Sequence, residues 1–255
     1  QNQAAGRSFG VVYLSQVDGS YRSKRIEEQN PIYGHKATAL DINGDKNVDI
    51  ITTDLIDPNQ PIGCGAPYVL LGHGDGTFTR DYRFIDQNFL RKTLTLCGMF
   101  NVDVIPIDGR HDIMISGLVN DGSGKGDWNV FWAKGIQNGF DFSSGKLMQM
   151  PFDAVTSSAF QFPLDIVYDE KTVGFYMKTT GSDFSVGANW AVMKFGLNGN
   201  FVGVIDTWLN ATANLMPTSP QFKPSYSNPG YLLAYTGGCA VDISKGDCGR
   251  RVAMH

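Results

Sequence analysis

Several features that mark large classes of protein are missing from this chain of 255 residues. It has no apolar run of about 18 residues, which excludes a transmembrane helix. It has no cluster of lysine and arginine, and its formal net charge is −4. Nucleic acid and anionic membranes are therefore poor partners for it. We find no amino-terminal signal peptide, so we expect a mature product or an excised piece of a longer chain.

Sequence motifs of familiar catalytic sites are missing as well. The chain contains no Gly-x-Ser-x-Gly elbow, no His-Glu-x-x-His pair and no Gly-x-x-x-x-Gly-Lys-Ser/Thr phosphate loop. Its 4 histidines are scattered along the sequence. Paired carboxylates of a glycosidase are defined by their separation in space, which a sequence does not contain. We therefore predict a protein without enzymatic activity.

Cysteine is scarce, and no two cysteines have the Cys-x-x-Cys spacing typical of zinc or redox sites. The 4 cysteines are Cys64, Cys97, Cys239 and Cys248. An even number favours two disulfides in an oxidising compartment. Cys239 and Cys248 would close a short loop, and Cys64 is placed to reach Cys97. Free buried thiols are the alternative.

The residues that are abundant indicate an all-β protein. Glycine occurs 30 times and charged residues make up only 18% of the chain, which is typical of a turn-rich β structure. Hydrophobic residues make up 42%, enough for one substantial core.

An Asp/Asn-rich loop at residues 41–49 has oxygen-bearing side chains at every second position. Calcium takes about 6–8 oxygen ligands, and a short loop of this spacing can wrap it. A helix-loop-helix calcium site needs a glutamate at the twelfth position, where this chain has Thr52 within an apolar run that predicts a strand. We predict one structural Ca²⁺; an ordinary Asp/Asn turn is the alternative. Its ligands would be the side chains of Asp41, Asn43, Asp45 and Asp49 and the backbone carbonyl of Asn47.

Two series of hairpins repeat along the chain with the same period. Outer hairpins are marked by turn glycines at positions 19, 76, 139 and 199, spaced by 57, 63 and 60 residues. Inner hairpins are marked by apolar strands at Ile51, Ile115, Tyr176 and Ala234, spaced by 64, 61 and 58 residues. A period of this kind is typical of a repeat architecture.

The Asp-rich loop, the strand after it and the turn Leu71-Gly-His-Gly-Asp-Gly-Thr-Phe78 together resemble the FG-GAP/VCBS type of repeat over residues 36–80. The resemblance implies a β-propeller blade with a structural calcium loop, in an extracellular protein that binds glycans or other proteins. The corresponding loops further along the chain lose most oxygen-bearing positions, so we expect one calcium ion and not four.

The order of the two series predicts how the ring closes. The chain begins with an unpartnered outer hairpin and ends with an unpartnered inner hairpin, and pairing the two would remove exposed sheet edges. We predict a single four-bladed propeller domain over residues 1–255. A fragment of a six- to eight-bladed propeller is the alternative. The expected blades are 33–86, 93–150, 158–208, and 214–245 joined to 6–28.

Long polar loops between the second and third strands of each blade are the candidate ligand-binding face. Each loop leads into an aromatic residue, and sugar rings stack on aromatic faces while Asp and Asn bind their hydroxyls. Rings that pack between blades and acids that are merely solvated are the alternative. The candidates are Tyr68, Asp121, Asp127, Trp128, Asn129, Asp183, Asn189 and Trp190.

Taken together, these patterns favour a non-enzymatic, secreted or cell-surface binding module with lectin-like or adhesive glycan recognition. Its partner would be a glycan or a cell-surface receptor, and an oligomer would strengthen weak single sites. A protein–protein adhesion domain is one alternative. A carbohydrate-active hydrolase or lyase, which needs clustered acids or a base, is the other.

Overall fold

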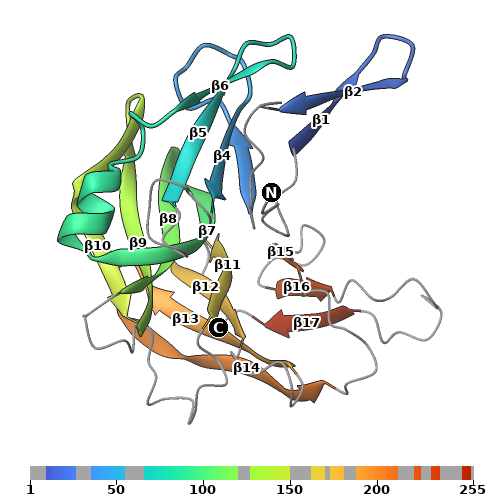
Figure 1. Ribbon diagram of the computed structural model, residues 1–255. Coiled ribbons are helices and arrows are strands. Elements are labelled where there is room, and N and C mark those ends of the chain that lie inside the picture. The colour runs from blue at the N-terminus through green and yellow to red at the C-terminus, as the bar shows by residue number, and fades with distance from the viewer. Residues whose placement is uncertain are drawn as a thin grey trace, which may run out of the picture. The chain divides into compact units, whose positions relative to one another are not determined.

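The structure is a computed structural model that describes ten segments of the chain. These are residues 10–26, 36–54, 66–119, 127–149, 162–169, 173–180, 188–211, 221–224, 231–235 and 249–253. Within them the regular structure consists of β-strands and one short π-helical turn, η1 (Phe89–Thr93) (Figure 1).

The strands form five sheets, in each of which neighbours in sequence are neighbours in space. Every pair whose register is described is antiparallel. The first sheet is β1 (Gly10–Ser15) and β2 (Tyr21–Ile26), and the second is β3 (Ala37–Leu40), β4 (Asp49–Asp54), β5 (Ala66–Gly72) and β6 (Phe78–Asp81). The third is β7 (Leu96–Ile107), β8 (Arg110–Val119), β9 (Asp127–Ile136) and β10 (Gly139–Gln149).

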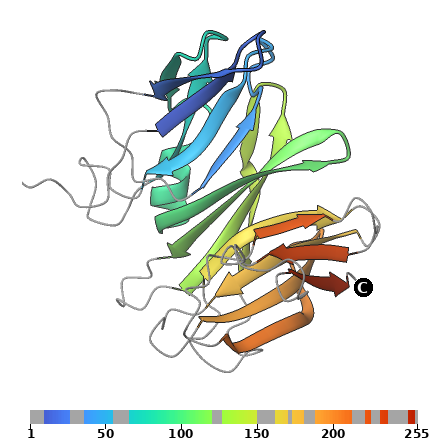
Figure 2. The same ribbon diagram turned by 90° about the vertical axis from the view of Figure 1, so that its right-hand side faces the viewer.

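The fourth sheet is β11 (Phe162–Asp169), β12 (Gly174–Thr180), β13 (Ala188–Gly196) and β14 (Phe201–Ala211), and the fifth is β15 (Gln221–Pro224), β16 (Tyr231–Tyr235) and β17 (Gly249–Ala253). The strands of each sheet can be followed in two views (Figures 1 and 2). The prediction of an all-β chain with four-stranded sheets is thus confirmed in its general form. Sequence analysis did not anticipate β17, which pairs with β16 beyond the expected end of the last inner hairpin.

Three outer hairpins use the same five-residue turn. The first amide donates to the fifth carbonyl in Gln16–Ser20, His73–Thr77 and Gly196–Asn200, at 2.8, 3.0 and 3.0 Å. In each, an Asp or Asn at the third position accepts a hydrogen bond from the fifth amide. The fourth residue is a glycine with φ near +80°, a backbone conformation that costs glycine little. The Asp/Asn-Gly pairs in the sequence therefore identified these turns correctly.

The chain divides into two compact units. The first comprises residues 1–104, 110–126 and 133–145, and the second comprises residues 105–109, 127–132 and 146–255. In the first unit, the hairpin β1–β2 packs one face against the second sheet, where Ile26, Tyr68 and Leu70 are buried together. Val12 from β1 and Phe78 from β6 pack against this cluster.

The second unit has an aromatic core. The ring of Trp132 meets the ring of Phe175 edge-on at 4.9 Å, and Tyr168 lies 5.5 Å from the same phenylalanine. Phe175 and Phe195 are fully buried. Among the described residues, no helix is long and apolar enough to cross a membrane.

Candidate functional site

The Asp-rich loop folds around the carboxylate of Asp41. Its Oδ1 accepts hydrogen bonds from the amides of Gly44 and Asp45 at 2.7 and 3.1 Å, and its Oδ2 accepts one from Lys46 at 2.8 Å. Gly44 and Lys46 have φ of +78° and +71°, which turns the chain back on itself. The carboxylate thus organises the loop through its backbone amides.

Asn43 and Asp45 extend this arrangement towards solvent. Asn43 donates from Nδ2 to Asp45 Oδ2 at 3.0 Å, and Asp45 Oδ1 accepts from the amide of Asn47 at 2.7 Å. The hydrogen bond from the Asn47 amide, followed by that from Asn43, lowers the pKa of Asp45 below its usual value. Side-chain oxygens of Asp41, Asn43 and Asp45 therefore gather around one turn.

Asp49 has a different role from the other acids of the loop. Its side chain is fully buried, and its Oδ2 accepts from the Ile42 amide at 2.9 Å. Its Oδ1 accepts from the amide of Gly72, the last residue of β5, at 2.8 Å. Asp49 therefore joins the loop to the third strand of its sheet. It was predicted to be a metal ligand; both of its oxygens accept from backbone amides, as those of Asp41 do, but Asp49 is fully buried whereas Asp41 is exposed.

The third sheet repeats this contact. Asp112 in β8 is fully buried, and its Oδ1 accepts from the amide of Gly135 in β9 at 2.9 Å. Its carboxylate is also held by Arg110, whose Nε donates to Oδ1 at 2.8 Å. Arg110 Nη2 also donates to Oδ2 at 3.3 Å, the oxygen that corresponds to the one that accepts from the Ile42 amide in Asp49. In the fourth sheet, Gly174 stands at the start of β12, so the aspartate contact is missing there.

A second charged group joins the edge strands of two sheets within the first unit. Lys36, just before β3, forms an ion pair with Asp103 of β7 at 2.5 Å. Their side chains are only 23% and 11% exposed. Beside them, Thr38 Oγ1 donates to the carbonyl of Val102 at 3.5 Å, and Thr52 Oγ1 donates to the carbonyl of Lys36 at 3.0 Å. The pair lies in a largely buried polar setting.

Asn101 adds to this polar group. It is buried, and it lies two residues before Asp103 on β7, so the alternation of a strand places both on the same face. Sequence analysis did not select Lys36, Asn101 or Asp103. Their types carry no motif, and they meet only through side-chain contacts between the edges of two separate sheets.

Two candidate ligand-binding residues are buried. Tyr68 is 1% exposed, and the guanidinium of Arg80 lies 4.0 Å from its ring centroid. Asn129 in β9 is 3% exposed. Tyr68 therefore packs inside its sheet region, as the packing alternative expected, and does not present its ring to a ligand.

The side chains of the other candidates on the predicted binding face lie outside the described part of the chain. Asp121 and Asp183 lie outside the described residues. Asp127 and Trp128 open β9, and Asn189 and Trp190 lie near the start of β13, where the structure gives the backbone alone.

Cys64, Cys239 and Cys248, three of the four cysteines that were predicted to form two disulfides, lie outside the described residues, and the fourth, Cys97, is described only as backbone of β7. Within the described segments, no group of three His, Cys, Asp or Glu side chains is arranged to hold a metal ion.

Comparisons with known proteins give only distant similarities. No protein-family model matches the sequence, and no curated protein matches it. One similar solved structure is a bifunctional GH43-CE protein from Bacteroides eggerthii, with a TM-score of 0.48 and 12% identity. The match covers 94% of this chain and 32% of that one. Another is an endo-arabinase from Bacteroides thetaiotaomicron VPI-5482, with a TM-score of 0.45, 8% identity, and coverage of 98% and 95%.

These comparisons correct the functional prediction. Sequence analysis favoured a non-enzymatic lectin-like module, whereas the solved structures found to be similar are of enzymes. The prediction was wrong in treating missing motifs as missing activity, because carboxylates on separate strands form no motif. A likeness at this level assigns neither an activity nor a substrate to this chain, so both must be argued from its own residues.

Proposed function

We propose that this protein is a carbohydrate-active enzyme that hydrolyses glycosidic bonds, with Asp103 as one of its working carboxylates. The observation that carries the proposal is the ion pair between Lys36 and Asp103, two charges held at 2.5 Å on edge strands with little exposure. Apolar residues of similar size commonly stabilise a core as well as a buried ion pair does. A buried charged pair is therefore better explained by chemistry than by stability.

The two charges have separate roles in this proposal. The Lys36 ammonium favours the ionised form of the carboxylate beside it, because an opposite charge at this distance stabilises the anion. An ionised Asp103 is suited to act as a base on water or as a nucleophile, and not as the proton donor. Asn101, on the same face of β7, is placed to hydrogen-bond a substrate hydroxyl.

Hydrolysis of a glycoside also needs a proton donor on the other side of the bond. We propose that it comes from the loop that leads into β9. Asp121, in the same unit as Asp103, is the acid to test there. This keeps the predicted loop face as a place of glycan contact but gives it a role in catalysis.

We further propose that the sheets are blades of one β-propeller. The meander order of each sheet supports it, since a propeller blade is a four-stranded antiparallel meander. The FG-GAP/VCBS resemblance would make the second sheet, β3–β6, a calcium-loop blade. An extracellular setting and a glycan partner follow from the same proposal.

A structural calcium ion in the loop 41–49 is also part of the proposal. The residues fit, because the side-chain oxygens of Asp41, Asn43 and Asp45 converge on one turn and are hard donors of the kind that calcium prefers. When bound, the ion would neutralise the loop's carboxylates. Asp49 would support the loop from behind through its two backbone hydrogen bonds.

The enzymatic proposal is tested by incubating the protein with a panel of neutral and acidic polysaccharides and measuring new reducing ends. Ultraviolet absorbance of unsaturated products is followed in parallel, because a lyase would raise it and a hydrolase would not. We expect reducing ends without unsaturation from at least one polymer. No product from any polymer would contradict the proposal.

A further inference from the structure

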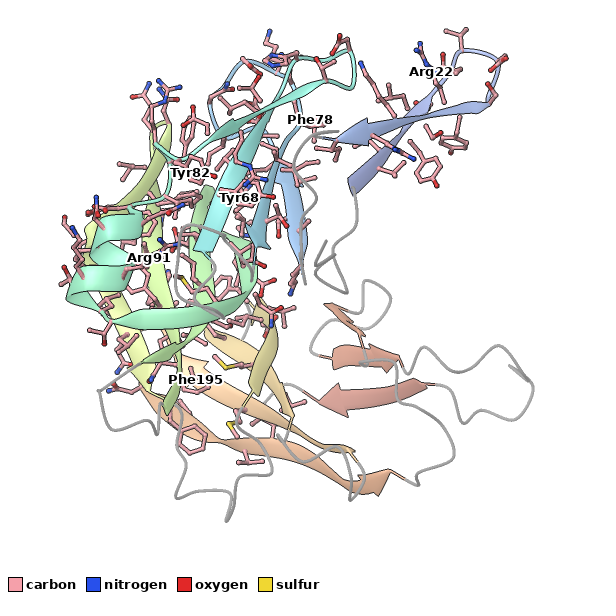
Figure 3. All side chains as sticks on the ribbon, viewed as in Figure 1. Arg22, Tyr68, Phe78, Tyr82, Arg91 and Phe195 are labelled. Atoms are coloured by element: carbon pink, nitrogen blue, oxygen red, sulfur yellow. The ribbon has the colours of Figure 1, made fainter. Side chains whose placement is uncertain are left out.

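A groove of about 550 Å³ opens on the first unit beside the end of β6 and the turn η1. Neither Lys36 nor Asp103 is among its lining residues, which come from one continuous stretch of chain. The lining residues are Tyr82, Arg83, Ile85, Asp86, Gln87, Asn88 and Arg91. Figure 3 labels Tyr82, at the end of β6, and Arg91, in η1.

Tyr82 presents an aromatic ring that is half exposed yet held in place. Its side chain is 49% exposed. Arg80 Nη1 donates to its hydroxyl at 3.2 Å, and the same arginine covers the buried ring of Tyr68. The two tyrosine rings lie 6.1 Å apart (Figure 3). An exposed ring fixed in this way is a preorganised surface on which a sugar can stack.

The remaining wall of the groove is fixed by its own hydrogen bonds. Asp86 Oδ1 accepts from the Phe89 amide at 2.8 Å, and the Asp86 carbonyl accepts from the Leu90 amide at 3.1 Å. Gln87 Nε2 donates to the carbonyl of Pro67 at 3.2 Å. Ile85 and Leu90 anchor the stretch in the core, with 1% and 0% exposure. The groove is thus built by packed residues and not by a loose surface loop.

The lining contains two arginines, Arg83 and Arg91, and one carboxylate, Asp86. A second carboxylate, Asp81, forms an ion pair with Arg83. The Arg83 side chain is 82% exposed and is oriented by Asp81, whose two carboxylate oxygens accept from its Nε at 3.1 and 2.9 Å. Guanidinium groups bind carboxylates strongly and with defined geometry. The exposed guanidinium of Arg83 is therefore oriented at the groove, where it can also bind an anionic ligand.

We propose that this groove is a binding subsite for an acidic oligosaccharide whose sugars carry carboxylates. One ring stacks on Tyr82, the sugar carboxylate contacts the Arg83 and Arg91 side of the groove, and Asn88 binds a hydroxyl. The subsite rests on the proposed carbohydrate activity for the class of ligand. It goes beyond that activity because Asp103 is not among the residues that line it and because it selects charge.

The test is calorimetric titration of the full chain with an oligogalacturonate and with its methyl ester, which has the same backbone without the charge. We expect the acid to bind and the ester to bind about tenfold more weakly. Tyr82→Ala and Arg83→Gln should each weaken the acid about tenfold. Tyr82→Phe, which keeps the ring, should retain most of the affinity. Tyr13→Ala, at another exposed tyrosine of the same unit, is the matched control and should change nothing.

Unchanged affinity in both Tyr82→Ala and Arg83→Gln, with folding intact by circular dichroism, would overturn the subsite. Equal binding of acid and ester would overturn its selectivity. Displacement by sulfate alone, with no dependence on Tyr82, would reduce the groove to an anion site and also overturn the proposal. Turnover that depends on Asp103 but not on Tyr82 would refute the subsite alone. Tyr82-dependent binding without turnover of any polymer would refute the enzymatic proposal alone.

Discussion

Asp49 and Gly72 form the contact that ties the Asp-rich loop to its sheet, with Asp49 Oδ1 accepting from the Gly72 amide at 2.8 Å. Gly72 cannot carry a side chain there, because a Cβ atom would lie 2.1 Å from the carbonyl oxygen of Val48. Asp112 and Gly135 repeat the relationship, and a Cβ at Gly135 would lie 2.1 Å from the carbonyl oxygen of His111. In both sheets the aspartate and glycine are 23 residues apart.

The first prediction concerns these glycines. Gly72→Ala and Gly135→Ala should each lower the free energy of unfolding by about 3 kcal/mol or more, since the backbone must move to admit a methyl group. Gly203→Ala is the matched control, because nothing lies within 4 Å of the Cβ it would add. Urea unfolding measures the free energy of unfolding of these three variants and of the wild type. A loss below about 1 kcal/mol at both contact glycines would contradict the packing described for them.

The second prediction concerns Asp49 itself. Asp49→Ala should lower the free energy of unfolding by about 2–4 kcal/mol, because it leaves the buried amides of Ile42 and Gly72 without their acceptor. The loss should be the same in calcium and in chelator, since the carboxylate acts on the backbone. A loss seen only in calcium would instead make Asp49 a metal ligand, as the sequence pattern suggested.

The third prediction concerns calcium. Wild-type protein should gain about 2.7 kcal/mol of stability when free calcium is about 100 times its dissociation constant. Asp45→Asn should remove most of that gain while changing little in chelator, because Asp45 is exposed and asparagine keeps an acceptor for the Asn47 amide. Thermal unfolding in calcium and in chelator makes the comparison. Identical unfolding of the wild type in both conditions would exclude the site.

The fourth prediction concerns acid. Hydrogen bonds from Ser143 and Ser144 lower the pKa of Asp141 to about 2. Its contribution to stability is therefore fully present above its ordinary pKa of 3.8 and is lost as the pH falls from there towards about 2. The double variant Ser143→Ala, Ser144→Ala should return the pKa towards its ordinary value. Carboxyl NMR titration measures the pKa of Asp141 in the wild type and in the variant. An unchanged pKa in the variant would refute the hydrogen bonds from Ser143 and Ser144 as the cause of the lowered pKa.

Much of the local structure was predictable from sequence because it depends on residues close together in the chain. The Asp/Asn-Gly turns at Gly19, Gly76 and Gly199 are local, and glycine φ and side-chain caps decide them. The inner strands were identified from apolar runs bounded by turn residues. The period of about 60 residues then gave the order of the sheets.

The candidate site was not predictable in the same way because it joins residues far apart in the chain. Lys36 and Asp103 are 67 positions apart in sequence and meet only when β3 and β7 lie side by side. Tyr68 was selected as a ligand-binding ring because it follows a polar loop, yet β5 is buried on both faces, with Tyr68 1% and Val69 0% exposed. Asp49 and Gly72 have the same spacing in sequence as Asp112 and Gly135. This repeated spacing is a sequence signal from which the contact between the aspartate carboxylate and the glycine amide could have been predicted.

The measurement that tests the enzymatic proposal most directly is turnover of the best polysaccharide by Asp103→Asn. The control is Asp108→Asn, an exposed turn residue on the same hairpin whose φ of +50° asparagine adopts readily. We predict that Asp103→Asn lowers kcat by about 10²-fold or more with folding intact, and that Asp108→Asn is as active as wild type. Equal turnover by both variants and the wild type would contradict the role of Asp103.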